Sequence, residues 1–171
     1  MYTYHLPPHL IAHTAAEPRE SARLLRWPEG DISTYADLPS YLAKGDVLVV
    51  NESKVLPARL FGQRKTRIAG QGVVKVELLL HRPLDATMTR WEAMAKPMRR
   101  LAVGDTIYVE GDALLTVEHI GEGFCHVRLH LQPEDVEPYL QAHGHTPLPP
   151  YIEAKDTPEV RARYQNVYAT T

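Results

Sequence analysis

The sequence predicts an α/β domain that is interrupted by a small antiparallel β-barrel. Residues 47–51, VLVVN, form a continuous apolar run directly after a helix-like segment, which is typical of a strand covered on both faces of an α/β layer. Between residues 60 and 132 the pattern changes to short alternating apolar runs separated by glycine turns, without a helical period. That second pattern favours a small closed barrel.

The first predicted part covers residues 1–59, and its clearest helix signal is DLPSYLAKG at 37–45. Asp37 is expected to cap this helix and Gly45 to end it, with an apolar face between them. The VLVVN strand then ends in Asn51, Glu52, Ser53 and Lys54. Ligands of such sheets bind beyond the carboxyl ends of the strands, so this polar run is a candidate site.

The predicted barrel covers residues 60–132. Apolar and polar side chains alternate along 74–80 and 126–130, and less cleanly along 113–117. We expect Val127 and Leu129 to face the barrel core, and His126, Arg128 and His130 to face solvent, because neighbouring side chains on a strand point to opposite faces.

Residues 133–171 are predicted to return to the α/β part. EDVEPYLQAHG at 134–144 indicates one helix, with Pro138 in its first turn, and a second helix is expected to begin at Pro158 with Thr157 as its cap. Together with residues 1–59 this part offers few strands, whereas open sheets commonly have about five or six. The layer is therefore expected to need further chain or a partner, and to leave apolar surface that promotes self-association.

Charge and composition narrow the functional classes. The net charge of −2 gives no global preference for nucleic acid, but two local clusters of basic residues are candidates for phosphate contacts: Arg59, Arg64, Lys65 and Arg67, and Lys96, Arg99 and Arg100. The alternative is that these clusters are only solvated loops. The nine histidines are not accompanied by ligands at zinc-like spacing, so no metal is expected.

The expected location is the cytoplasm. The single cysteine, Cys125, excludes an internal disulfide and fits a reducing compartment. The amino terminus, MYTYHLPPHL, lacks the basic and apolar segments of a secretory signal. No run approaches the roughly 18 apolar residues of a membrane span, so no membrane partner is expected.

A set of local strings carries a resemblance to a known family. These strings are EPRESARLL (17–25), GDVLVVNESKVLPARL (45–60), WEAMAKPMRRLAVGD (91–105), GHTPLPPYI (144–152) and RYQNVYA (163–169). In order and spacing the sequence resembles the S-adenosylmethionine:tRNA ribosyltransferase-isomerase family of queuosine biosynthesis. The family strings they match include E-P-R-D-x-S-R-L-L, G-x-x-P-L-P-P-Y-I and R-Y-Q-T-V-Y-A. The resemblance extends over nearly the whole chain.

The resemblance implies an α/β domain with an inserted barrel and a specific reaction. Family members transfer the ribosyl part of S-adenosylmethionine to a deazaguanine base in the tRNA anticodon and isomerise it, which gives epoxyqueuosine and releases adenine and methionine. S-adenosylmethionine is then a co-substrate, tRNA is the partner, and no permanently bound cofactor is expected. The matched positions make Asn51, Lys54, Arg59, Tyr164 and Gln165 the candidate substrate-binding residues. No residue is marked as the general base.

Two departures from the family pattern are visible. The family string N-D-T-R is replaced by Asn51-Glu52-Ser53-Lys54, which exchanges a bidentate arginine for the point charge of Lys54. Family members are also about twice as long and continue with a string like A-A-P-T-A-G-L-H-F after R-Y-Q-T-V-Y-A. The resemblance therefore implies that these residues are the N-terminal half, inactive by itself.

Alternatives remain open at the level of the sequence. One is a non-catalytic RNA-binding module built on the barrel, and another is an inactive fragment or subunit that needs a complementary chain. At the level of single residues, Asn51–Lys54 could form only a loop, with Arg59 paired to Glu52, and Tyr164 could be a core residue rather than a base-stacking one.

Overall fold

The computed structural model describes residues 3–67, 72–149, 151–152 and 155–169. By its internal contacts the chain divides into two units. One unit is Val55–Pro147, and the other combines Met1–Lys54 with Leu148–Thr171. Each unit is described by itself below.

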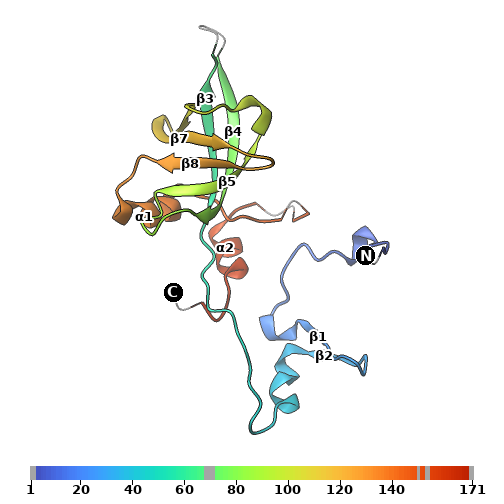
Figure 1. Cartoon of the computed structure of the whole chain (residues 1–171). Coiled ribbons are helices and arrows are strands. Elements are labelled where there is room, and N and C mark those ends of the chain that lie inside the picture. Colours follow the sequence, from blue (N-terminus) through green and yellow to red (C-terminus); the bar gives the residue numbers. More distant parts are fainter. Residues whose placement is uncertain (1–2, 68–71, 150, 153–154, 170–171) are drawn as a thin grey trace. The chain divides into compact units, whose positions relative to one another are not determined.

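The unit Val55–Pro147 contains a closed antiparallel barrel, which confirms the prediction of a barrel (Figure 1). Its strands follow the order β3-β4-β5-β8-β7-β6 around the barrel, and the ring closes where Gln63 on β3 pairs with Tyr108 on β6. The strands are β3 (Arg59–Lys65), β4 (Val73–Pro83), β5 (Arg90–Lys96), β6 (Thr106–Val109), β7 (Asp112–Ile120) and β8 (Cys125–Leu129).

The barrel core follows from the alternation in the sequence. Along β8, Val127 and Leu129 are buried while Arg128 and His130 are exposed and His126 is half-buried, so the predicted register is confirmed. The interior is filled by aliphatic side chains, among which Leu60, Leu78 and Ile107 are fully buried. Between β3 and β8, the described residues contain one helical piece, the single turn η4 (Met98–Arg100). This agrees with the absence of a helical period in the sequence.

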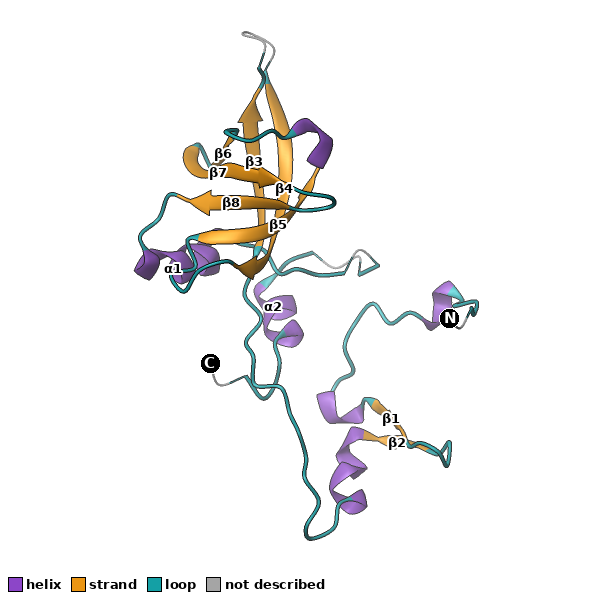
Figure 2. Cartoon of the chain, viewed as in Figure 1, coloured by secondary structure: helices purple, strands orange, loops and turns teal. Residues whose placement is uncertain are grey.

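Helix α1 (Pro133–His143) belongs to the barrel unit, whereas the sequence pattern assigned it to the α/β part. Val136 and Leu140 are buried on its apolar side, and the helix lies at the end of the barrel opposite the one where β3 ends (Figures 1 and 2). The helix begins at Pro133, so Pro138 lies beyond the first turn in which the sequence had placed it.

The other unit is sparser than the α/β layer that the sequence predicts. It contains the two-stranded sheet of β1 (Arg23–Leu25) and β2 (Ile32–Thr34), and its helical pieces are η1 (Pro8–Leu10), η2 (Arg19–Ser21), η3 (Tyr35–Tyr41) and α2 (Pro158–Tyr164). Helix α2 begins where predicted, because the Thr157 hydroxyl accepts a hydrogen bond from the Val160 amide at 3.3 Å.

Two predictions for this unit are wrong. Residues 47–50 form no strand, and Val47 and Val49 are 86% and 88% exposed, because a strand needs a neighbour to receive its backbone hydrogen bonds and no described strand lies beside them. The helix expected at 37–45 is the shorter 3-10 helix η3. Thr34 is its N-cap, and the Asp37 carboxylate accepts a hydrogen bond from the Thr34 amide at 2.9 Å instead of capping the helix itself.

Candidate functional site

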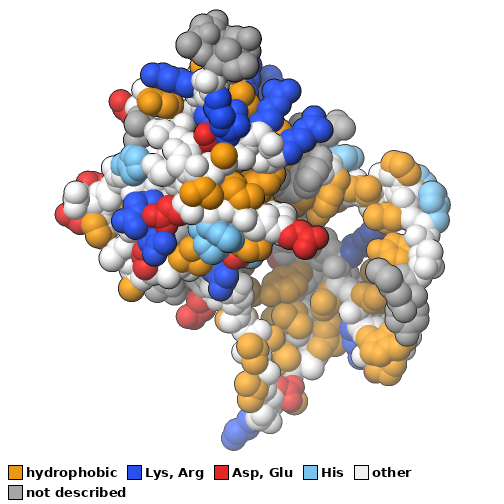
Figure 3. All heavy atoms as spheres, turned by 45° about the horizontal axis from the view of Figure 1, so that its top comes forward, with side chains coloured by type: hydrophobic (Ala, Val, Ile, Leu, Met, Phe, Trp, Pro, Cys, Tyr) orange, Lys and Arg blue, Asp and Glu red, His pale blue; other side chains and the backbone are white. Residues whose placement is uncertain are grey.

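A basic surface lies at the end of the barrel where β3 ends and η4 begins. We call this surface the basic end, and its exposed cationic residues are Lys65, Arg67, Lys96, Arg99 and Arg100. Figure 3 shows Lys and Arg side chains gathered over this end of the barrel. The sequence placed these residues in two separate clusters, and the barrel brings the clusters together.

The basic end is held in shape by the buried residue Arg64. Its Nη1 and Nη2 atoms donate to the backbone oxygens of Lys65 and Arg100 at 2.7 and 2.9 Å. Its Nε lies 3.3 Å from Oδ2 of Asp105, and the same oxygen lies 2.7 Å from Nη2 of Arg67. Arg64 was a candidate for contact with the tRNA backbone, but these contacts make it a support for the loop that carries the exposed arginines.

Arg59 also has a partner inside the barrel unit. Its Nε lies 3.3 Å from Oε1 of Glu77, so the sequence-level alternative of a pair with Glu52 is replaced by a pair with Glu77. The Arg59 backbone exchanges hydrogen bonds with His145, which follows helix α1. Arg59 therefore fastens the segment after α1 to the first strand of the barrel.

Asn51 and Lys54 lie in the other unit, in an exposed extended segment. The Asn51 side chain accepts from the Ser53 amide at 2.8 Å, which shapes the turn locally. The side-chain amide of Asn166 donates to the backbone oxygens of Asn51 and Ser53, the latter at 3.3 Å. The structure thus brings the strings NESK and RYQNVYA together through Asn166, a residue that sequence reasoning had not singled out.

A second contact joins the strings EPRES and RYQNVYA. Arg19 donates hydrogen bonds to the backbone oxygens of Ala162, Arg163 and Gln165 at 2.7, 2.6 and 3.0 Å. It thereby supplies hydrogen-bond donors to carbonyls at the C-terminal end of α2. Glu17 lies 2.5 Å from Nη2 of Arg163. The opposite charges of Glu17 and Arg163 were the signal in the sequence for this ion pair, but charge alone does not determine which residues pair.

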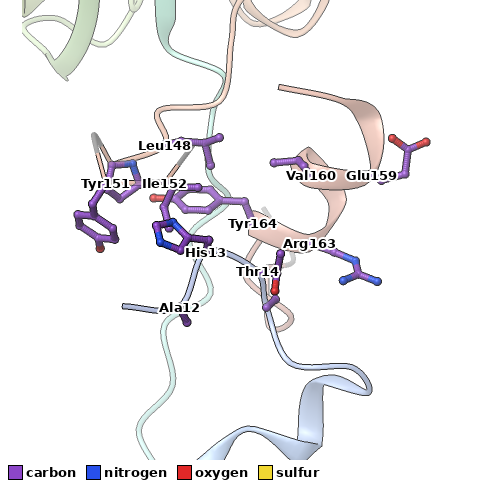
Figure 4. Close-up of a pocket in the computed structure, with 12 residues that line it drawn as sticks. Ala12, His13, Thr14, Leu148, Tyr151, Ile152, Glu159, Val160, Arg163 and Tyr164 are labelled. Carbon is purple, nitrogen blue, oxygen red and sulfur yellow. The ribbon is translucent and has the colours of Figure 1, made fainter. Parts of the chain in front are cut away.

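The same unit contains a cavity of about 550 Å³ between the segment 12–15, the segment 148–152 and helix α2. Tyr164, His13 and Tyr151 contribute aromatic rings, and Leu148 and Ile152 contribute apolar walls. In Figure 4 the Tyr164 ring points from α2 towards Ile152 and His13, while the charged ends of Glu159 and Arg163 point away from it. An apolar slot with aromatic walls suits a flat aromatic ligand such as a nucleobase.

Tyr164 is therefore placed at a cavity, as a binding role requires, and is 39% exposed rather than a core residue. Gln165 has a local role: its side-chain oxygen accepts from the Asn166 amide at 3.0 Å, and its backbone ends helix α2.

Within the described residues no group of three or more His, Cys, Asp or Glu side chains is arranged to hold a metal ion. No described helix is long and apolar enough to cross a membrane.

The fold and the two surfaces define the class first: a small-barrel protein with a basic barrel end and, in its other unit, a pocket of about 550 Å³ with aromatic walls. Residues 1–171 match the family described as queuosine biosynthesis protein, and the chain belongs to that family. The resemblance found in the sequence strings is thereby confirmed.

Named relatives fall in the same family. The chain is 45% identical over 180 residues to the S-adenosylmethionine:tRNA ribosyltransferase-isomerase of Azorhizobium caulinodans, which covers 98% of this chain and 50% of that protein. It is 46% identical over 173 residues to the protein of the same name from Rubrobacter xylanophilus, covering 98% and 47%. The chain thus spans about half the length of the curated relatives that it matches.

A crystal structure of the S-adenosylmethionine tRNA ribosyltransferase from Thermotoga maritima is also similar in sequence. It is 28% identical, and the match covers 83% of this chain and 47% of that one. The TM-score is 0.36, which is too low for the superposition to support the fold.

Proposed function

We propose that this chain supplies the tRNA-binding barrel and part of the substrate site of an S-adenosylmethionine:tRNA ribosyltransferase-isomerase. The observation that carries the proposal is the match over 98% of the chain, at 45% and 46% identity, to two proteins of that name. The reaction would transfer the ribosyl part of S-adenosylmethionine to the deazaguanine base in the tRNA anticodon and isomerise it to epoxyqueuosine, with release of adenine and methionine.

The basic end supports a tRNA-binding role. Lys65, Arg67, Lys96, Arg99 and Arg100 are exposed around one end of the barrel, where they can neutralise neighbouring phosphates. Arg64 is left out of this contact set because its guanidinium is engaged by Asp105 and two backbone oxygens. Small barrels commonly bind nucleic acid, so this role agrees with the fold.

The pocket beside α2 supports a role in holding a purine. Its volume of about 550 Å³ leaves ample room for an adenine or a deazaguanine, and its Tyr164, His13 and Tyr151 rings offer aromatic surfaces for stacking. Asn51 offers an amide for a ribose hydroxyl, and the exposed Lys54 offers a cation for the methionine carboxylate or a phosphate.

The first experiment measures binding of precursor-bearing tRNA to the chain over a range of salt concentrations. Arg99→Gln with Arg100→Gln should lower the affinity and reduce the slope of log affinity against log salt by roughly one unit per lost contact. The control is Lys44→Gln, which removes an exposed positive charge from the other unit, distant in sequence from Arg99 and Arg100. Equal slopes for the double variant and the wild type would contradict the assignment of the basic end.

The second experiment measures adenine release from S-adenosylmethionine. The 171-residue chain alone should not turn over, because transfer needs the donor ribose and the acceptor base held together in a dry site and the described pocket is open to solvent. Co-expression with the C-terminal half of the Azorhizobium caulinodans relative should restore adenine release, and Tyr164→Ala should abolish the restored activity.

Two outcomes of the second experiment would overturn parts of the proposal. Steady turnover by the chain alone would place the whole site within these residues. Tight tRNA binding that never leads to adenine release in the complemented pair would instead favour a non-catalytic RNA-binding module.

We also propose that the 171-residue chain self-associates through exposed apolar side chains. Trp27, Val47 and Val49 are 86%, 86% and 88% exposed, which is unusual for large apolar residues. Light scattering should show a mass above that of one chain, and Val47→Lys with Val49→Lys should return it to the monomer. A monomer in the wild type would contradict this part.

A further inference from the structure

A groove of about 580 Å³ runs over the outer face of the barrel where β3, β4 and β6 meet. Apart from Gly62 and the core residue Val76, its lining residues alternate with the core residues of their strands, so they point outward while their neighbours fill the barrel. The residues that matter below are Phe61, Gln63, Lys75, Glu77, Lys96 and Tyr108. Of these six residues, the sequence analysis singled out only Lys96.

Two aromatic rings form the apolar part of the groove. Phe61 is 51% exposed although it sits within β3, and the ring of His145 meets it edge-on with centroids 5.0 Å apart. Tyr108 lies on the adjacent strand β6 and is half-buried, and the ammonium of Lys65 lies over its ring, 5.1 Å from the centroid. Exposed aromatic rings on a sheet are the platforms on which unpaired bases stack in single-strand-binding proteins.

Two lysines supply the charge. Lys75 lies opposite Gln63 in the β3–β4 register, and Lys96 lies opposite Glu77 in the β4–β5 register. Both lysines are exposed, and neither makes an ion pair within the described residues. They are therefore available to anions that enter the groove.

The two carboxylates of the groove already have side-chain partners at its margins. Glu77 lies 3.3 Å from Nε of Arg59, and Glu110 lies 2.6 Å from Nδ1 of His143. Because each is paired, neither presents an isolated negative charge to a phosphate. Lys65 of the basic end lies on the same strand, at the end of β3 and two residues after Gln63.

We propose that this groove binds one or two unpaired nucleotides of an RNA, with bases stacked on Phe61 and Tyr108 and phosphates held by Lys75 and Lys96. The proposal rests on the RNA partner of the proposed function and adds a single-strand site to it. It follows that the barrel prefers unpaired RNA to duplex RNA, because paired bases cannot leave their stack to reach a sheet.

The test uses the full 171-residue chain and a labelled single-stranded RNA of about twelve nucleotides with 2-aminopurine at one position. Fluorescence anisotropy reports affinity, and quenching of 2-aminopurine reports stacking. Phe61→Leu keeps an apolar side chain but removes the ring, and should weaken binding at least about fivefold and abolish the quenching. Phe124→Leu, the same change on the β7–β8 hairpin, is the matched control.

Two further measurements complete the test: the salt dependence of a lysine variant, and competition by an acidic peptide. Lys75→Gln, a change in the groove but outside the basic end, should reduce the salt slope, while Lys44→Gln should not. Circular dichroism and thermal unfolding establish that each variant is folded. A glutamate-rich peptide should displace the RNA poorly; displacement at equal concentration would show simple charge capture and overturn the proposal.

The outcomes separate this inference from the proposed function. If Phe61→Leu binds the single strand as the wild type does, with the quenching retained, the groove is not the site, and tRNA binding by the basic end is unaffected. If duplex RNA binds as well as single-stranded RNA, the stacking proposal fails. If the wild-type chain binds no RNA at all, the proposed function fails together with it.

Discussion

The Nε atom of Arg64 lies 3.3 Å from Oδ2 of Asp105, and the two side chains are only 7% and 13% exposed. The pair lies beneath the exposed arginines of the basic end, and Asp105 also accepts from the Ala102 amide at 2.8 Å. The loop that presents Arg99 and Arg100 is therefore built on a buried ionic contact. Binding and stability at this end of the barrel depend on different arginines.

Arg64→Ala should lower the free energy of unfolding by about 2–3 kcal/mol, because it leaves the backbone oxygens of Lys65 and Arg100 without their donor. Arg99→Ala, at an exposed position, should change stability by no more than about 0.5 kcal/mol. Urea denaturation measures both. The opposite ranking of the two variants would show that Arg64 is not the support of this loop.

Arg19→Leu should loosen the end of helix α2. The variant loses the donor to the backbone oxygens of Ala162, Arg163 and Gln165, so local opening should become easier. Amide hydrogen exchange over residues 160–165 should accelerate by about tenfold, which corresponds to the loss of roughly one net hydrogen bond. Arg23→Leu, an exposed change in β1, is the control, and equal exchange in both variants would contradict the role of Arg19.

Gly144→Ala should disrupt the connection between α1 and the barrel. A Cβ atom at this position would lie 1.8 Å from the backbone oxygen of Pro57 and 2.5 Å from that of Leu140, so the backbone itself must move. We expect a loss of about 1–3 kcal/mol in unfolding free energy, as is usual for overpacking. The exposed change Gln141→Ala should be nearly neutral; a neutral Gly144→Ala would show that this contact relaxes freely.

Cys125 should be inert in the folded chain. Burial raises the pKa of its thiol to about 11, and its Sγ lies 3.5 Å from the backbone oxygen of Ala93. Since the thiolate is the reactive form, a raised pKa leaves very little of it near pH 8, and the thiol is also out of reach. A thiol-specific chromogenic reagent should react only after concentrated urea is added. Rapid reaction of the native chain would show that the interior of the barrel opens readily.

Much of the barrel was determined by the sequence alone. The period-2 alternation along β4 and β8 depends only on the direction of successive side chains, so it predicted which residues fill the core. The start of α2 was equally local, because Thr157 and Pro158 act on the adjacent turn. The family strings also marked segments that contact one another in the structure, through the hydrogen bonds of Asn166 and Arg19.

Only the tertiary structure decided how those segments are used. The apolar run 47–50 has the composition of a buried strand, yet no described strand pairs with it, because burial and pairing depend on neighbours distant in the sequence. In the same way, the sequence does not distinguish Arg64 from Arg99, because each is an arginine within a basic cluster. Their separate roles, one supporting and one presented to solvent, arise from the position of Asp105, which the fold brings to Arg64 and not to Arg99.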